Sequence, residues 1–150
     1  MPETLNSDID ENSSRRIDVE LFIAHPTLSP AEITAALGLE AHFAHGVGDP
    51  RKALKGITLE GRYPDTRWRH SIRYTQTDQW FADKVSMLVN SLMPQKTFLH
   101  HLRDTGGSAQ IIVQFLGDGY LTDSVPSITL TTMAELRLDF GIECFAIPQS

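Results

Sequence analysis

The longest helical pattern in the sequence spans residues 77–107, TDQWFADKVSMLVNSLMPQKTFLHHLRDTGG. Apolar side chains recur in its first half at spacings of three and four, which places them on one face of an α-helix. They are Phe81, Val85, Leu88 and Leu92. Because Pro94 lacks an amide hydrogen, we expect the helix to kink or split there and to continue until Gly106 and Gly107 end it. The apolar face predicts a sheet beneath the helix, and the stretch carries no recognisable chemistry.

The length and charge of the chain restrict the class of protein. Its 150 residues suit one domain, long enough to bury roughly two thirds of the unfolded surface. A formal net charge of −6 argues against nucleic acids and anionic membranes as partners, and it would suit a basic protein. Residues 1–16 lack the apolar segment of a secretory signal, and no window has the length of a membrane-spanning helix. We therefore expect a cytoplasmic protein.

The N-terminal part of the chain predicts a tail followed by a strand. Residues 1–14 are expected to be a flexible tail, because they hold too few large apolar side chains to offset the entropy lost on folding. A single α+β domain is expected over residues 15–150. From residue 17 apolar and polar side chains alternate as in a strand, and the apolar set is Ile17, Val19, Leu21 and Ile23. Asp18, Glu20 and Phe22 lie on the opposite face, which we expect to be in water.

A short helix is predicted directly after this strand from its capping signals. Ser29 suits the N-cap, and Pro30 suits the first helical position, where its missing amide hydrogen costs nothing. Glu32 completes a capping box with Ser29. Gly38 can take the left-handed conformation that ends a helix.

The C-terminal part predicts a second short helix and a last strand. Thr132 and Glu135 repeat the capping-box spacing, and Gly141 is expected to end this helix. The last strand is predicted over residues 142–147. Cys144 is the only cysteine, so no intrachain disulfide can form, and we interpret it as a small buried apolar side chain.

The middle of the chain predicts two further strands around the long helix. Residues 66–76 alternate Trp68 and Ile72 with arginines, and residues 108–117 are apolar on both sides, as in a central strand. Residues 41–66 are rich in glycine, proline and basic residues, and they are predicted to be an irregular excursion with a short strand at residues 42–47. The resulting order of elements favours a ferredoxin-like α+β sandwich, with a mixed or antiparallel sheet and helices packed on one face.

Basic residues gather on one face of the predicted strand at residues 66–76. Arg67, Arg69 and Arg73 lie opposite Trp68, and guanidinium groups suit carboxylates and phosphates. Together with the excursion before them they predict a ligand- or partner-binding site, for which the candidates are Asp49, Arg51, Arg69 and Arg73. The alternative is that the arginines pair with acids on neighbouring strands and only keep this face hydrated and the sheet edge protected. Their partners in that case are expected to be Asp18, Glu20 and Glu143.

Six histidines raise the question of a metal site. In a turn, His42, His45 and Asp49 would converge on a metal ion, which makes a metal-dependent enzyme the alternative function. We interpret His70 as a core histidine bonded to backbone or to a carboxylate. The sequence has no nucleophile elbow and no phosphate-binding loop, so we expect no cofactor and favour a protein that is not an enzyme.

Three pieces of the sequence together resemble a known family. They are LSPAEITAALGLEA at residues 28–41, GDPR at residues 48–51, and Trp68 in the strand before the long helix. The set resembles the bacterial family of uncharacterised proteins catalogued as domain of unknown function 4279, over roughly residues 17–148. The sequence departs from that pattern in AHFAHGV, residues 41–47, where a tryptophan and basic residues are expected before the Gly-Asp. The resemblance implies no activity and supplies no catalytic residue.

We therefore predict a non-enzymatic binding module. Its partner is expected to be a basic protein, as for an immunity or antitoxin-like factor, or a small anionic ligand. No nucleic-acid or membrane partner is expected. The alternative remains a metal-dependent enzyme with a site around His45 and Asp49. An apolar edge such as Phe145 and Ile147 would suit a homodimer.

Overall fold

A computed structural model describes residues 16–74, 81–117 and 122–145 of the chain. The predicted tail at residues 1–14 and the first residues of the long helix lie outside these ranges. Five strands form the main sheet: β1 (Arg16–His25), β2 (Phe43–His45), β5 (Thr66–Tyr74), β6 (Ser108–Leu116) and β7 (Asp139–Phe145). Four α-helices are described with it: α2 (Pro30–Leu37), α3 (Phe81–Ser91), α4 (Lys96–Asp104) and α5 (Ser127–Glu135).

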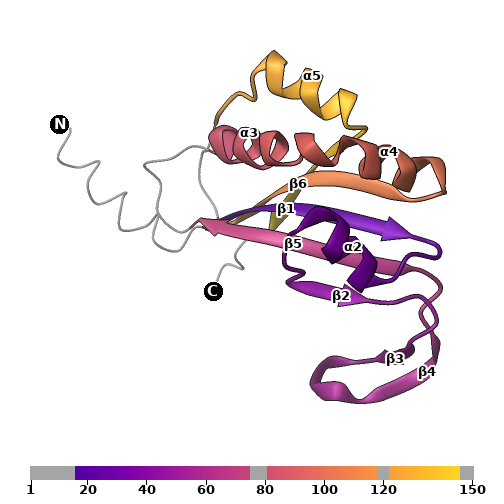
Figure 1. The fold of residues 1–150 in the computed structure, drawn as a ribbon. Coiled ribbons are helices and arrows are strands. Elements are labelled where there is room, and N and C mark those ends of the chain that lie inside the picture. The colour runs from indigo at the N-terminus through magenta and orange to yellow at the C-terminus, as the bar shows by residue number, and fades with distance from the viewer. Residues whose placement is uncertain (1–15, 75–80, 118–121, 146–150) are drawn as a thin grey trace.

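The main sheet is mixed and has the strand order β2-β5-β1-β6-β7 (Figure 1). The pairs β2–β5, β5–β1 and β1–β6 are antiparallel, and β7 runs parallel to β6. β6 therefore lies inside the sheet, as its apolar residues on both sides predicted. The α+β class is confirmed, and the narrower ferredoxin-like assignment stays a prediction.

Helices cover one face of the sheet, which we call the covered face. It carries the apolar set of β1 together with Trp68 of β5 and Ile111 of β6, all of them buried. These side chains form one core with Ile33 of α2, Val85 of α3 and residues of α4 and α5. None of the described helices has both the length and the hydropathy needed to cross a membrane.

The capping signals of α2 are confirmed in full. Ser29 Oγ accepts a hydrogen bond from the amide of Glu32 (3.1 Å), and a carboxylate oxygen of Glu32 accepts one from the amide of Ser29 (3.1 Å). Gly38 ends the helix at φ 68°, where a side chain would be strained. Local chemistry alone therefore fixes both ends of this helix.

The long helix splits at Pro94, as predicted. α3 ends at Ser91, a 3₁₀ turn η2 (Met93–Gln95) contains the proline, and α4 starts at Lys96. Gly106 has φ 96°, and a Cβ on Gly107 would lie 2.7 Å from Cδ2 of His25. The two glycines thus end α4 for different reasons: the first takes a left-handed conformation, and the second makes room for β1.

The capping box predicted for the last helix is wrong. α5 begins at Ser127 after Pro126, so Thr132 lies inside the helix, where its hydroxyl donates to the carbonyl of Ile128 (3.1 Å). The helix is ended by Arg137, whose φ is 57°, and the predicted stop, Gly141, lies in β7. Cys144 of β7 is exposed, which corrects its interpretation as a buried side chain.

Two further predictions are corrected by the sheet and by the segment beside it. Residues 41–66 are more regular than predicted, since β3 (Pro50–Lys52) and β4 (Thr58–Arg62) pair as an antiparallel ribbon with a 3₁₀ turn η1 (Leu54–Gly56) between them. This ribbon lies at the end of the molecule away from α3, α4 and α5 (Figure 1). The second face of β1 is not in water, because Asp18 and Glu20 are both buried.

Candidate functional site

The second face of the sheet, which we call the open face, carries polar side chains from four neighbouring strands. The described helices pack on the other face. Strand register brings Asp18 of β1 between Arg73 of β5 and Gln114 of β6, and Glu20 next to Ser71. Glu143 of β7 follows beside Gln114, and Phe43 of β2 lies beside Arg69. Residues far apart in the chain therefore meet on one surface.

Glu20 is the most deeply buried acid of the open face. Its side chain is 5% exposed and forms an ion pair with Nη1 of Arg69. Ser71 Oγ donates a hydrogen bond to its other carboxylate oxygen (2.9 Å). The guanidinium of Arg69 also lies over the ring of Phe22, with Cζ 4.2 Å from the ring centroid. Arg69 is thus fixed by a charge on one side and by an aromatic ring on another.

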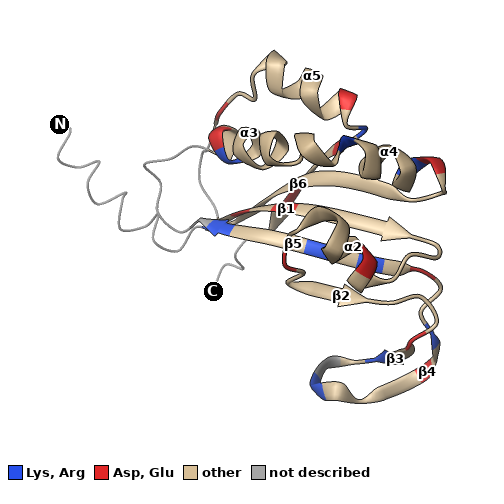
Figure 2. Cartoon of the chain, in the orientation of Figure 1, with Lys and Arg blue, Asp and Glu red and all other residues tan. Residues whose placement is uncertain are grey.

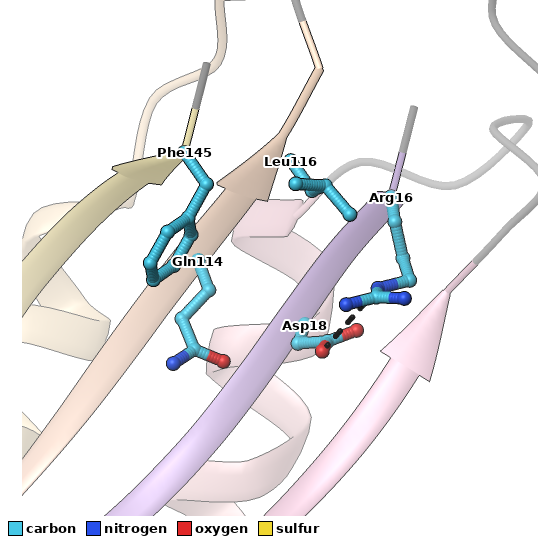
Figure 3. Close-up of a pocket in the computed structure, with 5 residues that line it drawn as sticks. All are labelled: Arg16, Asp18, Gln114, Leu116 and Phe145. Carbon is cyan, nitrogen blue, oxygen red and sulfur yellow. Dashed lines mark ion pairs between the residues drawn. The ribbon is translucent and has the colours of Figure 1, made fainter. Parts of the chain in front are cut away.

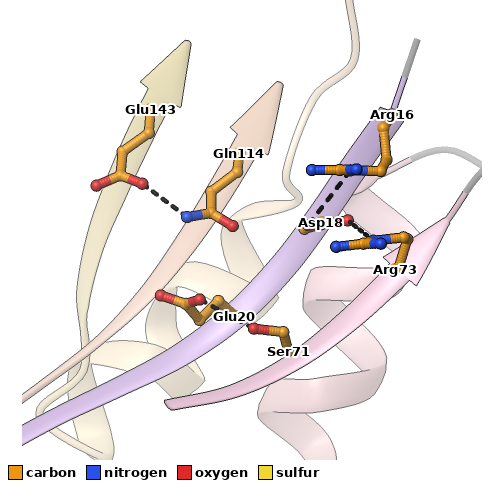
Figure 4. A network of polar contacts seen from close by, with 7 residues as sticks. All are labelled: Arg16, Asp18, Glu20, Ser71, Arg73, Gln114 and Glu143. Atoms are coloured by element: carbon orange, nitrogen blue, oxygen red, sulfur yellow. Dashed lines mark hydrogen bonds and ion pairs between the residues drawn. The ribbon is translucent and has the colours of Figure 1, made fainter. Parts of the chain in front are cut away.

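Asp18 binds two arginines at once. Its oxygens lie 3.4 Å from Nε of Arg73 and 3.7 Å from Nε of Arg16. Dashed lines mark both ion pairs in Figure 4. The Asp18 side chain is 11% exposed, whereas that of Arg73 is 58% exposed. The carboxylates therefore lie at the base of the open face and the guanidiniums lie above them. Beside this pair, Gln114 Nε2 donates to Glu143 (2.7 Å).

A hollow of about 520 Å³ lies over these groups. It is lined by Asp18, Glu20, His42, Phe43, Arg69, Ser71, Arg73 and Gln114. A smaller hollow of about 270 Å³ continues from it towards Leu116 and Phe145, and shares Asp18 and Gln114 with it (Figure 3). The polar surface of this face is therefore hollowed, and each hollow has one aromatic side chain in its lining, Phe43 in the larger and Phe145 in the smaller.

Two of the four predicted site residues meet in the larger hollow. Arg69 and Arg73 line it together, and they share one face of β5, as the alternation in this strand predicted. Asp49 lines another hollow of about 400 Å³ between β2 and the ribbon, which shares Phe43 with the larger one. Arg51 lies on β3, is exposed, and donates from Nη1 to the carbonyl of Glu60 (3.4 Å). Figure 2 shows the basic residues of the ribbon and those of β5 as separate blue segments.

The proposed metal ligands are engaged elsewhere. Nδ1 of His42 accepts a hydrogen bond from the amide of Ser71 (3.0 Å), and His45 stacks on Tyr63 with ring centroids 3.6 Å apart. Asp49 accepts a hydrogen bond from the amide of Gly46 (3.2 Å). His42 and His45 line different hollows, and in the part of the chain that the structure describes no three His, Cys, Asp or Glu side chains gather in a metal-binding group.

His25 and His45, each with a lowered pKa, lie outside the larger hollow. Burial lowers the pKa of His45, as does the charge of Arg67, and the charges of Asp65 and Asp49 oppose this. Burial also lowers the pKa of His25, with a contribution from His101. His70 bonds the backbone as predicted, with Nδ1 at 2.7 Å from the carbonyl oxygen of Glu40.

Several residues of the open face were not among the predicted site residues. Phe22, Phe43, Ser71 and Gln114 contribute to it through strand register, which joins segments up to about a hundred positions apart. One signal was available in the sequence: Phe22 is an apolar residue on the otherwise acidic face of β1. Such an exception in a polar alternation indicates a side chain with a cross-strand partner, which here is Arg69.

The open face combines paired charged groups with exposed donors and one apolar side chain. Its two buried carboxylates, Asp18 and Glu20, are held by guanidinium and hydroxyl groups of β5. The exposed guanidinium of Arg73 retains donors for an anion, and the ring of Phe43 provides an apolar wall. The geometry therefore suits a small solute with a negative group and an apolar part.

Comparison with protein families finds a match over most of the chain. A family model described as a domain of unknown function (DUF4279) matches residues 15–142. No curated protein and no solved structure matches the chain.

Proposed function

The chain belongs to the DUF4279 family, whose description names no activity, and from its open face we propose that it is a non-enzymatic protein that binds a small anionic ligand. The site is the larger hollow, where Arg69 and Arg73 lie together. The function is recognition of a carboxylate or phosphate group by guanidinium donors.

One observation carries the proposal: buried carboxylates hold the arginines of the hollow from below. Glu20 fixes Arg69, and Asp18 fixes Arg73 through Nε, while the Arg73 side chain stays 58% exposed. An arginine has five N–H donors, so one bond to Asp18 leaves others for a solute. Because the side chains are ordered before the ligand arrives, less entropy is lost on binding. An arginine–carboxylate pair that served only to keep this face hydrated would not need a buried carboxylate.

The charge of the network narrows the class of ligand. Arg16, Arg69 and Arg73 are balanced by Asp18, Glu20 and Glu143, and Arg67 is paired with Asp65. The face as a whole therefore carries no excess positive charge. A ligand with many negative charges would meet repulsion from the acids beneath the arginines. An organic monocarboxylate whose apolar part lies against Phe43 fits better than a polyphosphate.

A thermal-shift screen with carboxylates and inorganic phosphate tests this function. At a ligand concentration of about ten times Kd, binding adds about 1.4 kcal/mol and raises Tm by about 4 °C for a chain of this size. Arg73→Ala should abolish the shift, because it removes the exposed guanidinium. We choose Arg73 over Arg69, since the loss of Arg69 would also leave Glu20 buried without its cation.

Arg67→Ala is the matched control. Arg67 lies on the same strand and the same face, its side chain is 50% exposed, and it pairs with Asp65 at 3.3 Å. It does not line the larger hollow. The shift should persist in this variant. Equal losses in Arg67→Ala and Arg73→Ala, or no shift with any carboxylate or phosphate, would contradict a site in the hollow.

A basic protein is the second candidate partner, and the net charge of −6 favours it. Because the open-face charges cancel, this excess of acid lies elsewhere in the chain, and it would speed association with a positive surface. Such a partner is expected of an immunity or antitoxin-like factor. Pull-down from cells of the source at low and at moderate salt should recover a basic protein whose yield falls with salt. Recovery that does not depend on salt would count against it.

A further inference from the structure

β7 is the last strand of the described sheet, and one of its edges has no neighbouring strand among the described residues. Its pairing with β6 shows which groups point towards that edge. The amide of Gly117 donates to the carbonyl of Phe145 (3.1 Å), so the backbone groups of Phe145 point towards β6. Because backbone groups alternate along a strand, those of Phe140, Ile142 and Cys144 point to the free edge. A strand of seven residues with such an edge is a template for pairing.

The side chains of the same three residues form an uncovered apolar row. Phe140, Ile142 and Cys144 lie on the helix side of β7, in register with Ile111, Val113 and Phe115 of β6. The β6 residues are covered by the helices, but all three β7 residues are exposed, and Ile142 is 62% exposed. α5 connects the two strands and packs on α3, so the helix layer ends before β7. The covered face therefore lacks its cover at this edge.

We propose that a second copy of this chain pairs with β7 in antiparallel orientation, with Ile142 on the two-fold axis. The two sheets then join into one continuous sheet. Each outward-pointing residue exchanges two backbone hydrogen bonds with its partner, Phe140 with Cys144 and Ile142 with Ile142 of the other copy. The exposed apolar rows of the two copies meet side by side.

The charges of β7 select this register. If the covered faces of the two copies lie on the same side of the joined sheet, the two-fold axis can pass through position 141, 142 or 143. With the axis at position 141, Asp139 would face Glu143 of the other copy. With the axis at position 143, the two Glu143 side chains would face each other. Both registers are disfavoured, because like charges opposite one another destabilise a pair of strands. With the axis at Ile142, Glu143 faces Gly141 and Asp139 faces Phe145. The two acids are also held within their own copy, Glu143 by Gln114 (2.7 Å) and Asp139 by Arg103 (3.2 Å).

Disulfide trapping tests the register with the native cysteine. In the proposed pair, position 140 lies opposite Cys144 with Cα atoms about 5.5 Å apart, which a disulfide spans. Phe140→Cys should therefore give a covalent dimer with oxidised glutathione. Phe140→Cys combined with Cys144→Ser is the matched control and should stay uncrosslinked. The wild type should also stay uncrosslinked, because its two Cys144 residues lie about four residues apart along the pair, or about 13 Å.

Sedimentation of the wild-type chain tests the dimer itself. Since an edge pair buries a small area, we expect a Kd of about 10 µM. Ile142→Lys should make the protein monomeric by placing two like charges on the axis, and Ile142→Val should not. Position 142 is exposed in the single copy, so neither change should lower Tm of the monomer. A monomer at all concentrations, a wild-type crosslink through Cys144, or an Ile142→Lys dimer would overturn the proposal. The anion-induced thermal shift is read separately and does not depend on this result.

Discussion

The two faces of one sheet bury residues of the same strand by opposite means. On the covered face, Val19, Leu21 and Ile23 of β1 are buried by apolar side chains from helices. On the open face, Asp18 and Glu20 of the same strand are buried by the arginines and the serine of β5. The first kind of burial stabilises the fold through area removed from water. The second fixes the position of charged groups and contributes less to stability.

The largest test of this comparison is a truncation on the covered face. Trp68 is fully buried there, and its Nε1 donates to Oγ1 of Thr34 (3.0 Å). Trp68→Ala should lower the free energy of unfolding by about 3–5 kcal/mol, because it removes a large apolar contact and leaves a cavity. Urea denaturation followed by circular dichroism measures this change.

Phe43→Ala is the control for that truncation on the opposite face. Phe43 lies on the neighbouring strand β2 and is exposed at the rim of the hollow. Its loss should cost less than about 1 kcal/mol, as for a partly exposed side chain. Similar costs for the two variants would mean that the faces do not differ as we describe.

The covered face was predictable because its signals are local. The apolar set of β1, the capping box at Ser29 and the missing amide of Pro94 each act within a few residues, and all three are confirmed. The error at Thr132 shows the limit of this approach. Its spacing to Glu135 matches a capping box, but Pro126 starts α5 earlier and buries Thr132 against the core. A local capping signal decides where a helix begins or ends only if tertiary packing does not already fix that position.

The open face could not be predicted to the same depth, because its geometry depends on register between distant segments. The sequence predicted the arginine row of β5 and proposed acids as its partners. It did not predict that Asp18 and Glu20 would be buried, since their exposure is set by side chains of β5 and β6, which lie about fifty to a hundred positions away. Nor did it separate Asp49 and Arg51 from Arg69 and Arg73, because the ribbon between them was expected to be irregular.

A second test removes the buried acid of the open face. Glu20→Ala leaves the guanidinium of Arg69 without its carboxylate, and the expected loss is about 1–3 kcal/mol in the free energy of unfolding. Replacing both partners, Glu20→Met with Arg69→Met, should recover most of that loss, because a buried pair contributes little beyond what apolar contacts give. Urea denaturation of the wild type, Glu20→Met, Arg69→Met and the double variant forms the complete cycle. A double variant that is less stable than either single one would contradict a replaceable network.

A third test follows stability against pH and concerns His25, the last residue of β1. His25 is buried, and its Nδ1 accepts hydrogen bonds from the amides of Thr27 and Leu28 (both 3.0 Å). Nε2 lies 2.7 Å from Oγ1 of Thr105, which itself donates to the carbonyl of His101, so His25 must be the neutral donor. Burial, and secondly the charge of His101, lower the pKa of His25.

The sign of the pH effect follows from this lowered pKa. The folded state disfavours the charged form, so the contribution of His25 is complete above about pH 6.5 and is lost as the pH falls through that value towards the lower folded pKa. The slope is at most about 1.4 kcal/mol per pH unit for one group. His25→Gln should flatten the stability profile between about pH 7 and pH 5, and His100→Gln should not. His45, whose pKa burial also lowers, keeps part of the slope in both variants. A profile unchanged by His25→Gln would rule out His25 as the source.

The smallest expected effect on stability belongs to the residue on which the proposed function depends most. Arg73 lies above Asp18 with its side chain 58% exposed, and Asp18 keeps Arg16 as a second cation when Arg73 is removed. Arg73→Ala should therefore change the free energy of unfolding by less than about 0.5 kcal/mol, as for an exposed ion pair. The same variant should lose the carboxylate-induced rise in Tm, whereas Arg73→Lys should keep part of it, because an ammonium retains the charge and lacks the fork. A variant that loses stability and ligand response together would show that Arg73 stabilises the fold, as the residues of the covered face do. The proposed distinction between a face for folding and a face for recognition would then fail at Arg73.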